Sequence, residues 1–195
     1  MAKKNIGRSF NIFPMPVVIV GTVTDGKPNF MTAAWVTKLN TEPPLLGLSL
    51  GRRQHTAKGI EQTGEFSLSY PTIDDVVLTD YLGLVHGYEE DKAAHVEIFE
   101  GALAHAPMVR RCPVTLECRL VQKVELPKDY LFIGEVVNVY ASESVLTDGK
   151  VDVLKLRPFV LTMPSNTYWA LGEPVGEAWS AGKALLKTTE GSDSQ

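Results

Sequence analysis

The first half of the chain consists of short runs of β-branched and apolar residues, each closed by a proline or an Asp-Gly pair. Residues 16–24 form one such run, Asp25 and Gly26 follow it, and residues 29–38 form the next. An Asp-Gly pair between two extended runs predicts a β-hairpin, because a type I′ turn needs a positive φ at both central residues. The same Thr-Asp-Gly-Lys tetrapeptide returns at residues 147–150, and two copies indicate recurrent turn chemistry and not a repeat architecture. This pattern favours a fold dominated by antiparallel strands.

The rest of the chain continues this pattern and adds a few helices. Further strands are predicted at residues 45–50, 65–70, 114–126, 130–141 and 158–163. Helices are predicted at residues 55–63, 73–85 and 175–187, the first ended by Gly64 and the second capped by Thr72. Residues 86–106 are expected to form a surface loop. Because no βαβ rhythm appears, we expect a mainly β fold, a β-barrel with peripheral helices.

The domain organisation predicted from this pattern is simple. No linker divides the chain, so residues 1–187 are expected to form a single domain. Residues 188–195 are polar and are expected to be a disordered tail.

Composition excludes several classes of function. The chain has 195 residues and a net charge of −4, and no basic excess indicates a nucleic-acid partner or an anionic membrane. Its two cysteines do not form a disulfide framework or a CxxC motif, and we expect both to be reduced. The basic N-terminus precedes an apolar run at residues 17–20 that is too short for a signal peptide, and no run approaches the roughly 20 residues of a membrane span. These features predict a cytoplasmic protein.

Common catalytic and nucleotide-binding motifs are missing or incomplete. Residues 21–27 fit GxxxxGK, but Pro28 stands where a phosphate-binding loop needs a hydroxyl residue for magnesium. The chain lacks GxGxxG, HExxH and GxSxG, and its four histidines do not have metal-ligand spacing. We therefore expect no metal site.

The transition from strand to helix at residues 49–58 is the first candidate binding segment. A helix beginning near Thr56 would present unpaired N–H groups and a positive dipole end. Arg52, Arg53 and Lys58 are poorly placed against that end unless an anion lies there, and a phosphate would satisfy them. The alternative is a solvated basic loop capped by Thr56, and the residues alone leave both interpretations open.

The strand at residues 29–35 is the second candidate segment. Its small central residues would let a flat ligand approach the backbone, whose polar groups could read the edge of a heteroaromatic ring beside Trp35. The alternative is a core strand with a packed Trp35. A phosphate at one segment and a flat polar ring at the other describe a flavin mononucleotide (FMN).

With these segments in place, the sequence resembles the flavin reductase-like, FMN-binding split-barrel family, and most closely its flavoredoxin branch. The resemblance runs from about residue 8 to residue 187, and its carrying stretches are residues 16–21, 29–35, 43–44, 49–50, 55–56, 91–92, 132–136 and 168–172. It implies a six-stranded antiparallel split barrel, a homodimer and one FMN per subunit near the dimer interface. The flavin contacts that it implies are Asn29, the backbone of Met31, Thr32 and Ala33, and Trp35. The phosphate contacts that it implies are Ser49, Arg53, His55, Thr56 and Lys92.

The sequence departs from the family pattern at two places near the expected flavin. His86-Gly87 stands where many relatives have Ser-Gly, and a histidine that many relatives carry before residues 132–135 is absent near Asp129. Both departures bear on the electron donor and acceptor more than on FMN.

The resemblance implies an FMN-dependent oxidoreductase. NAD(P)H would pass a hydride to the flavin, which would reduce free flavin, ferric complexes or a protein partner. We expect no catalytic acid or base. The alternatives are a flavoredoxin-type electron carrier without direct NAD(P)H oxidation, a non-redox split-barrel binding module and, as a minor variant, a pyridoxamine phosphate oxidase-like protein.

Overall fold

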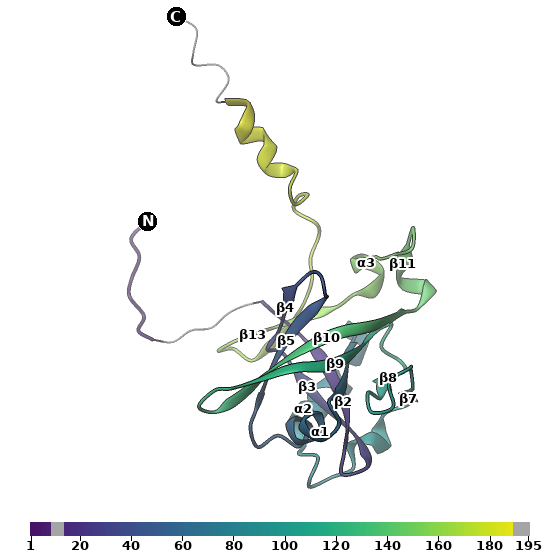
Figure 1. The fold of residues 1–195 in the computed structure, drawn as a ribbon. Coiled ribbons are helices and arrows are strands. Elements are labelled where there is room, and N and C mark those ends of the chain that lie inside the picture. The colour runs from purple at the N-terminus through teal and green to yellow at the C-terminus, as the bar shows by residue number, and fades with distance from the viewer. Residues whose placement is uncertain (9–13, 189–195) are drawn as a thin grey trace, which may run out of the picture.

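The protein, seen here in a computed structural model that describes residues 1–8 and 14–188, is built around one antiparallel sheet (Figure 1). The sheet contains seven strands, whereas the resemblance implied six. These are β2 (Val18–Thr24), β3 (Lys27–Ala33), β4 (Val36–Asn40), β5 (Leu45–Gly51), β6 (Glu65–Tyr70), β9 (Val114–Glu125) and β10 (Asp129–Ala141). Their order across the sheet is β3-β2-β6-β9-β10-β5-β4.

The additional strand arises because residues 29–38 do not form the single strand that was predicted. Ala34 and Trp35 interrupt it, and the two parts, β3 and β4, lie at opposite ends of the strand order. The chain from Ala33 to Val36 can span at most about 11 Å, so the two ends of the sheet must meet there. The Ser49 amide on β5 donates to the Trp35 carbonyl at 2.9 Å, which extends the β4–β5 pairing up to the break. The sheet therefore curls into a split barrel.

Both Asp-Gly turns are confirmed. Asp25 and Gly26 have φ angles of 51° and 79°, and Thr24 pairs with Lys27 across the turn. The second pair of turn residues, at 148–149, likewise has positive φ and joins β11 (Leu146–Thr147) to β12 (Lys150–Val151).

Two helices pack near β2 and β3: α1 (His55–Thr63) contributes Ala57 and Ile60 to the barrel core, and α2 (Val76–Leu84) contributes Leu82 to the second apolar cluster. Helix α1 ends, as predicted, at Gly64, which has a φ of 66°. It approaches β2 so closely that a Cβ on Gly59 would lie 2.3 Å from Thr24 Oγ1. Helix α2 follows a 3₁₀ turn, η1 (Ile73–Asp75), and Thr72 caps that turn as predicted.

The alternation of side chains along β2 separates two apolar cores. Val18 and Val20 point into the barrel, where they meet Phe66 and Phe132. Ile19 points the other way and packs in a second cluster. The other members of that cluster are Phe30, Leu82, Val96, Val109 and Cys112.

Shorter elements complete the body of the molecule. The predicted loop at residues 86–106 contains η2 (Lys92–His95) and β7 (Ile98–Phe99), which pairs with β8 (Met108–Val109). A second sheet joins β1 (Met15–Pro16), β13 (Phe159–Thr162) and β14 (Thr167–Ala170), the last of which was not predicted. The 3₁₀ turn η3 (Glu143–Val145) and helix α3 (Val153–Leu156) lie beside the β11–β12 hairpin.

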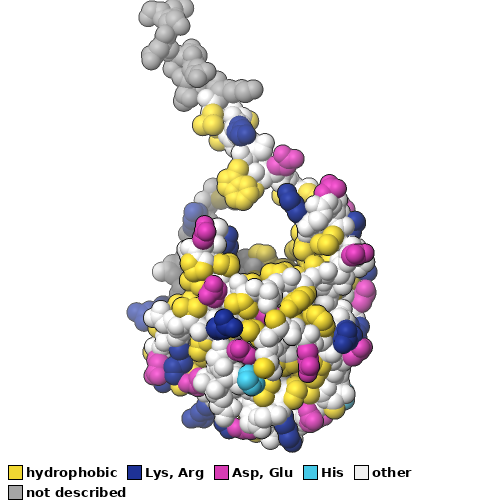
Figure 2. Space-filling model, turned by 45° about the vertical axis from the view of Figure 1, so that its right-hand side comes forward, with side chains coloured by type: hydrophobic (Ala, Val, Ile, Leu, Met, Phe, Trp, Pro, Cys, Tyr) yellow, Lys and Arg dark blue, Asp and Glu magenta, His cyan; other side chains and the backbone are white. Residues whose placement is uncertain are grey.

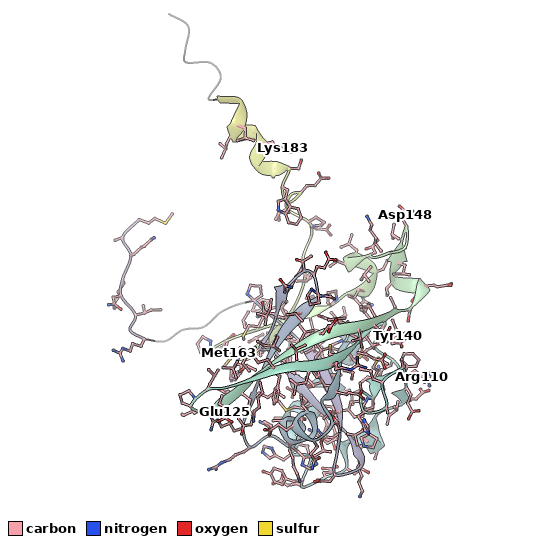
Figure 3. All side chains as sticks on the ribbon, viewed as in Figure 1. Arg110, Glu125, Tyr140, Asp148, Met163 and Lys183 are labelled. Carbon is pink, nitrogen blue, oxygen red and sulfur yellow. The ribbon has the colours of Figure 1, made fainter. Side chains whose placement is uncertain are left out.

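The C-terminal segment leaves the barrel after β14. The helix predicted at residues 175–187 is present only as the 3₁₀ helix η4 (Ala181–Thr188), which projects away from the sheet. Figure 3 shows Lys183 on this projection, well apart from the labelled side chains of the barrel. Except for Thr188, the predicted tail lies outside the described residues. None of the helices in the described part of the chain is long and apolar enough to cross a membrane.

Candidate functional site

The start of α1 lies against β3 through a buried polar contact. Asn29 on β3 donates from Nδ2 to Thr56 Oγ1 at 2.7 Å, and both side chains are buried. Helix α1 has the predicted bounds, residues 55–63, but Gln54 stands at the N-cap position, so the prediction that Thr56 caps the helix is wrong. The hydroxyl of Thr56 is instead held beside the first turn by Asn29.

The first turn of α1 is open to an anion. The first intrahelical bond runs from the Lys58 amide to the Gln54 carbonyl, so the amides of His55, Thr56 and Ala57 come before it. The Gln54 side chain makes no capping bond, and the first turn contains no acidic residue. These amides and the positive end of the helix dipole therefore form an anion-binding arrangement of backbone donors.

Only one of the three cations in this segment lacks a partner among the described residues. Arg52 pairs with Glu125 at 3.4 Å, and Lys58 pairs with Asp25 at 2.6 Å. Arg52 and Lys58 therefore need no bound anion, contrary to the prediction from the sequence. Arg53 is exposed and makes neither an ion pair nor a hydrogen bond with the part of the chain that the structure describes.

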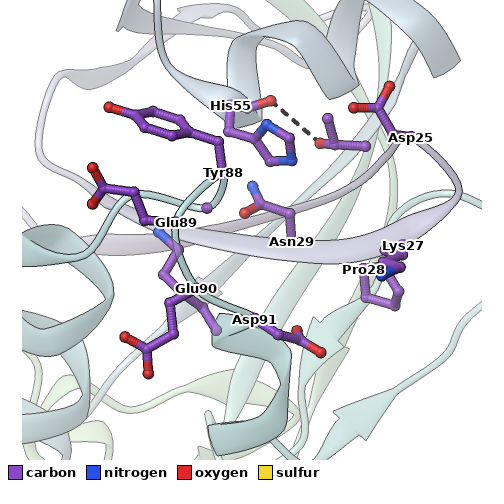
Figure 4. A pocket seen from close by; sticks show the side chains of 12 residues that line it. Asp25, Lys27, Pro28, Asn29, His55, Tyr88, Glu89, Glu90 and Asp91 are labelled. Carbon is purple, nitrogen blue, oxygen red and sulfur yellow. Dashed lines mark hydrogen bonds between the residues drawn. The ribbon is translucent and has the colours of Figure 1, made fainter.

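A cavity of about 310 Å³ lies beside Asn29 and His55 (Figure 4). The loop at residues 87–91 forms its opposite wall. A Cβ on Gly87 would lie 2.3 Å from Asn29 Oδ1 and 3.0 Å from His55 Cδ2, so only glycine allows the loop to lie this close. Lys92 also lines the cavity, so the structure brings together four of the predicted site residues: Asn29, His55, Thr56 and Lys92.

Lys92 is buried at the C-terminal end of α2. Its ammonium donates to the carbonyls of Leu82 and Val85 at 3.0 and 2.9 Å, an arrangement that also favours the negative end of that helix. Burial lowers the pKa of Lys92 to about 8. Burial likewise lowers the pKa of His55, with Asp25 opposing the shift and the two neighbouring lysines adding to it.

A larger cavity of about 620 Å³ adjoins the first and shares Tyr88 with it. Arg52, Arg53 and Lys128 line it, so it is strongly cationic. The rings of His86 and Tyr88 stack with centroids 5.2 Å apart and planes 9° apart. The His86-Gly87 departure pointed to this loop, and the departure near Asp129 pointed to the β9–β10 hairpin, which brings in Lys128.

The predicted ring contacts Asn29, Met31, Thr32 and Ala33 lie on β3, whose neighbour in the sheet is β2, and Trp35 lies in the break between β3 and β4. Met31 and Ala33 pack against the barrel core, and the hydroxyl of Thr32 donates to the carbonyl of Thr79. Trp35 is 53 % exposed, so it is not the packed core residue of the alternative interpretation. The hydrogen bond from the Ser49 amide to the Trp35 carbonyl brings the two candidate segments into direct contact.

Comparison with known proteins places this arrangement in a family context. A family model described as the flavin reductase like domain matches residues 10–156. The structure is similar to a flavoredoxin from Methanosarcina acetivorans, with 41% identity and a TM-score of 0.93 over 95% of this chain and 100% of that one. It is also similar to a flavoredoxin of Desulfovibrio vulgaris (Miyazaki F), with 34% identity and a TM-score of 0.86 over 93% of this chain and 100% of that one. An uncharacterized protein of Archaeoglobus fulgidus is 32% identical over 144 residues, which are 73% of this chain and 80% of that protein.

Proposed function

Because this chain belongs to the flavin reductase-like family, as its sequence resemblance predicted, we propose that it is an FMN-dependent oxidoreductase. The observation that carries the proposal is the uncapped first turn of α1 beside the unpaired Arg53. Backbone amides and one guanidinium suit the single phosphate of FMN, and FMN bound there needs no wider basic surface.

The residues present fit this cofactor. Ser49, Arg53, His55, Thr56 and Lys92 would hold the phosphate, and Asn29, the backbone of Met31, Thr32 and Ala33, and Trp35 would contact the ring system. The close approach of Gly87 to Asn29 and His55 supports a narrow site that a side chain would obstruct. When bound, FMN supplies the redox chemistry by accepting and releasing electrons.

The protein's own residues bind and orient in this proposal. Arg53 contributes a positive charge that is not neutralised by another described residue, and Asn29 fixes the hydroxyl of Thr56 by its 2.7 Å bond. Burial lowers the pKa of His55 and so disfavours the charged imidazole, and in this proposal His55 contributes a hydrogen bond to the phosphate. We assign no side chain as a catalytic acid or base.

The larger cavity supports NAD(P)H as the electron donor. An adenine nucleotide presents a flat ring and phosphates, and the cavity offers the stacked His86 and Tyr88 together with Lys128. His86 lines this cavity and not the first one, so His86→Ala is expected to raise the KM for NAD(P)H while leaving the Kd for FMN unchanged.

A second candidate function is a flavoredoxin-type electron carrier, which the similarity to two flavoredoxins favours. Anaerobic mixing of the FMN-loaded protein with NADH, with NADPH or with a reduced ferredoxin separates the two functions. Rapid bleaching of the flavin by a nicotinamide donor supports the oxidoreductase. Bleaching by the reduced protein alone supports the carrier, and absence of FMN binding contradicts both and leaves the non-redox module. In either redox function we propose that the protein acts as a homodimer.

A further inference from the structure

The charge that lines the larger cavity differs from that of the protein as a whole. The chain has a net charge of −4, and Figure 2 shows basic and acidic side chains mixed over the face that it presents. Three cations line the larger cavity, and among the residues that the structure describes no Asp or Glu joins them. The smaller cavity beside Asn29 is lined by four carboxylates and two lysines. A second anionic ligand is therefore attracted to the larger cavity more than to the smaller one.

Of the three cations, Lys128 is the one left for a second ligand. In the proposed function Arg53 serves the phosphate of FMN, and Arg52 pairs with Glu125 at 3.4 Å. The ammonium of Lys128 makes neither an ion pair nor a hydrogen bond with the described parts of the chain. A free ammonium in the wall of a cavity is available to a phosphate of the ligand.

Contacts with the turn between β5 and α1 fix the backbone of Lys128 beside the cavity. Lys128 lies at the tip of the β9–β10 hairpin, and its carbonyl accepts a hydrogen bond from the Arg52 amide at 3.2 Å. The ring of Tyr130 lies 5.1 Å from the guanidinium carbon of Arg52 and 4.4 Å from the ammonium of Lys123, measured to the ring centroid. The hairpin tip is therefore held against the site and does not hang free.

The stacked rings of His86 and Tyr88 line the same cavity as Lys128, and both side chains are exposed. An adenine can extend this stack. The extra phosphate of NADPH is attached to the ribose carbon next to the one that bears the adenine, whereas the pyrophosphate is attached at the far end of that sugar. A cation that shares a cavity with the ring stack is therefore well placed for the 2′-phosphate.

The lining also lacks what a site for NADH needs. A carboxylate that accepts a hydrogen bond from the ribose 2′-hydroxyl favours NADH, and a cation at that place accommodates the 2′-phosphate of NADPH. The described lining of the larger cavity offers cations and no carboxylate. Its volume of about 620 Å³ lies within the roughly 300–1,000 Å³ typical of small-molecule sites.

We propose that the larger cavity selects NADPH over NADH and that Lys128 is the residue that recognises the 2′-phosphate. This inference rests on the proposed function, in which a nicotinamide nucleotide is the electron donor. It adds the choice between the two nucleotides and the residue that makes it.

Isothermal titration of the FMN-loaded protein with two adenine nucleotides tests the selection without turnover. Adenosine 2′,5′-bisphosphate carries the 2′-phosphate, adenosine 5′-monophosphate lacks it, and bound FMN keeps Arg53 occupied. We expect the bisphosphate to bind at least about 10-fold more tightly, the contribution of one hydrogen bond between charged groups. Lys128→Met should reduce the difference to less than about 3-fold. The matched control is Lys150→Met, because Lys150 is also exposed but is not among the residues that line either cavity, and we expect no change there.

Steady-state kinetics then distinguish recognition of the 2′-phosphate from recognition of the pyrophosphate. We expect Lys128→Met to lower the ratio of kcat/KM for NADPH to that for NADH about 10-fold. An unchanged ratio, or equal affinity of the wild type for the two adenine nucleotides, would overturn the proposal and leave FMN binding unaffected. A wild-type protein that binds FMN but neither nucleotide would overturn the proposal together with the assignment of this cavity to NAD(P)H. Failure to bind FMN would contradict the proposed function itself.

Discussion

Replacing Arg53 with alanine measures what one cation contributes to holding the phosphate. The side chain is exposed and makes no ion pair or hydrogen bond within the described parts of the chain, so its loss removes no contact from the fold. A hydrogen bond to a charged group contributes about 1.5–3 kcal/mol, and solvent screening at an exposed position favours the lower half of that range. Since about 1.4 kcal/mol corresponds to a factor of ten, the Kd for FMN is expected to rise about 10-fold to 40-fold.

The neighbouring arginine provides the matched control for this prediction. Arg52 is paired with Glu125 at 3.4 Å and lies over the ring of Tyr130, with 5.1 Å between its guanidinium carbon and the ring centroid. Arg52→Ala is therefore expected to change the Kd for FMN less than about 3-fold, the size of a surface-pair effect.

Isothermal titration with FMN and with riboflavin, which lacks the phosphate, separates the contributions of charge and ring. Arg53→Ala is expected to weaken the binding of FMN and to leave riboflavin unaffected. Wild-type affinity for FMN in this variant, or an equal loss for both ligands, would refute the assignment of Arg53 to the phosphate.

Three further predictions follow from the contacts around the site and the barrel. Gly87→Ala places a Cβ 2.3 Å from Asn29 Oδ1, so we expect weaker FMN binding and a free energy of unfolding lowered by about 1–3 kcal/mol. The control is Gly172→Ala, whose Cβ meets no atom within 4 Å, and equal losses of FMN affinity and stability in the two variants would contradict the steric explanation. Because the pKa of Lys92 is lowered to about 8, FMN affinity should fall as pH rises through that value, and Lys92→Met should abolish this pH dependence. Between about pH 8 and 10.5 the unfolded chain binds more protons at Lys92 than the folded one, so the free energy of unfolding of the flavin-free wild type should rise over this range, as urea denaturation can test. Glu117 is buried and accepts bonds from a backbone amide, an asparagine amide and a tyrosine hydroxyl, so Glu117→Gln should lower the free energy of unfolding by about 2–3 kcal/mol and leave the Kd for FMN unchanged.

The parts of the fold that sequence could predict are those set by local chemistry. Asp25-Gly26 specifies a hairpin because few other pairs accept two positive φ angles, and Gly64 ends α1 for a related reason. The break at Ala34 and Trp35 could not be predicted in this way, because neither residue is a turn former. That break follows from closure of the barrel, which depends on strands far apart in the sequence.

The candidate site likewise contains contacts that the sequence could predict and contacts that it could not. The contact between Asn29 and Thr56 follows from two segments whose importance the sequence already indicated. The partners of Arg52 and Lys58 come from β9 and from the β2–β3 turn, so their neutralisation was invisible in a local pattern. The sequence therefore overestimated the positive charge at the start of α1, while identifying the segment itself.

Titration of the purified protein with FMN tests the central claim most directly. After unbound flavin is removed, visible absorbance gives the amount of flavin that remains with the protein. The α1 site predicts one FMN per chain in the wild type. A wild-type protein that stays colourless at saturating FMN would contradict the proposed function.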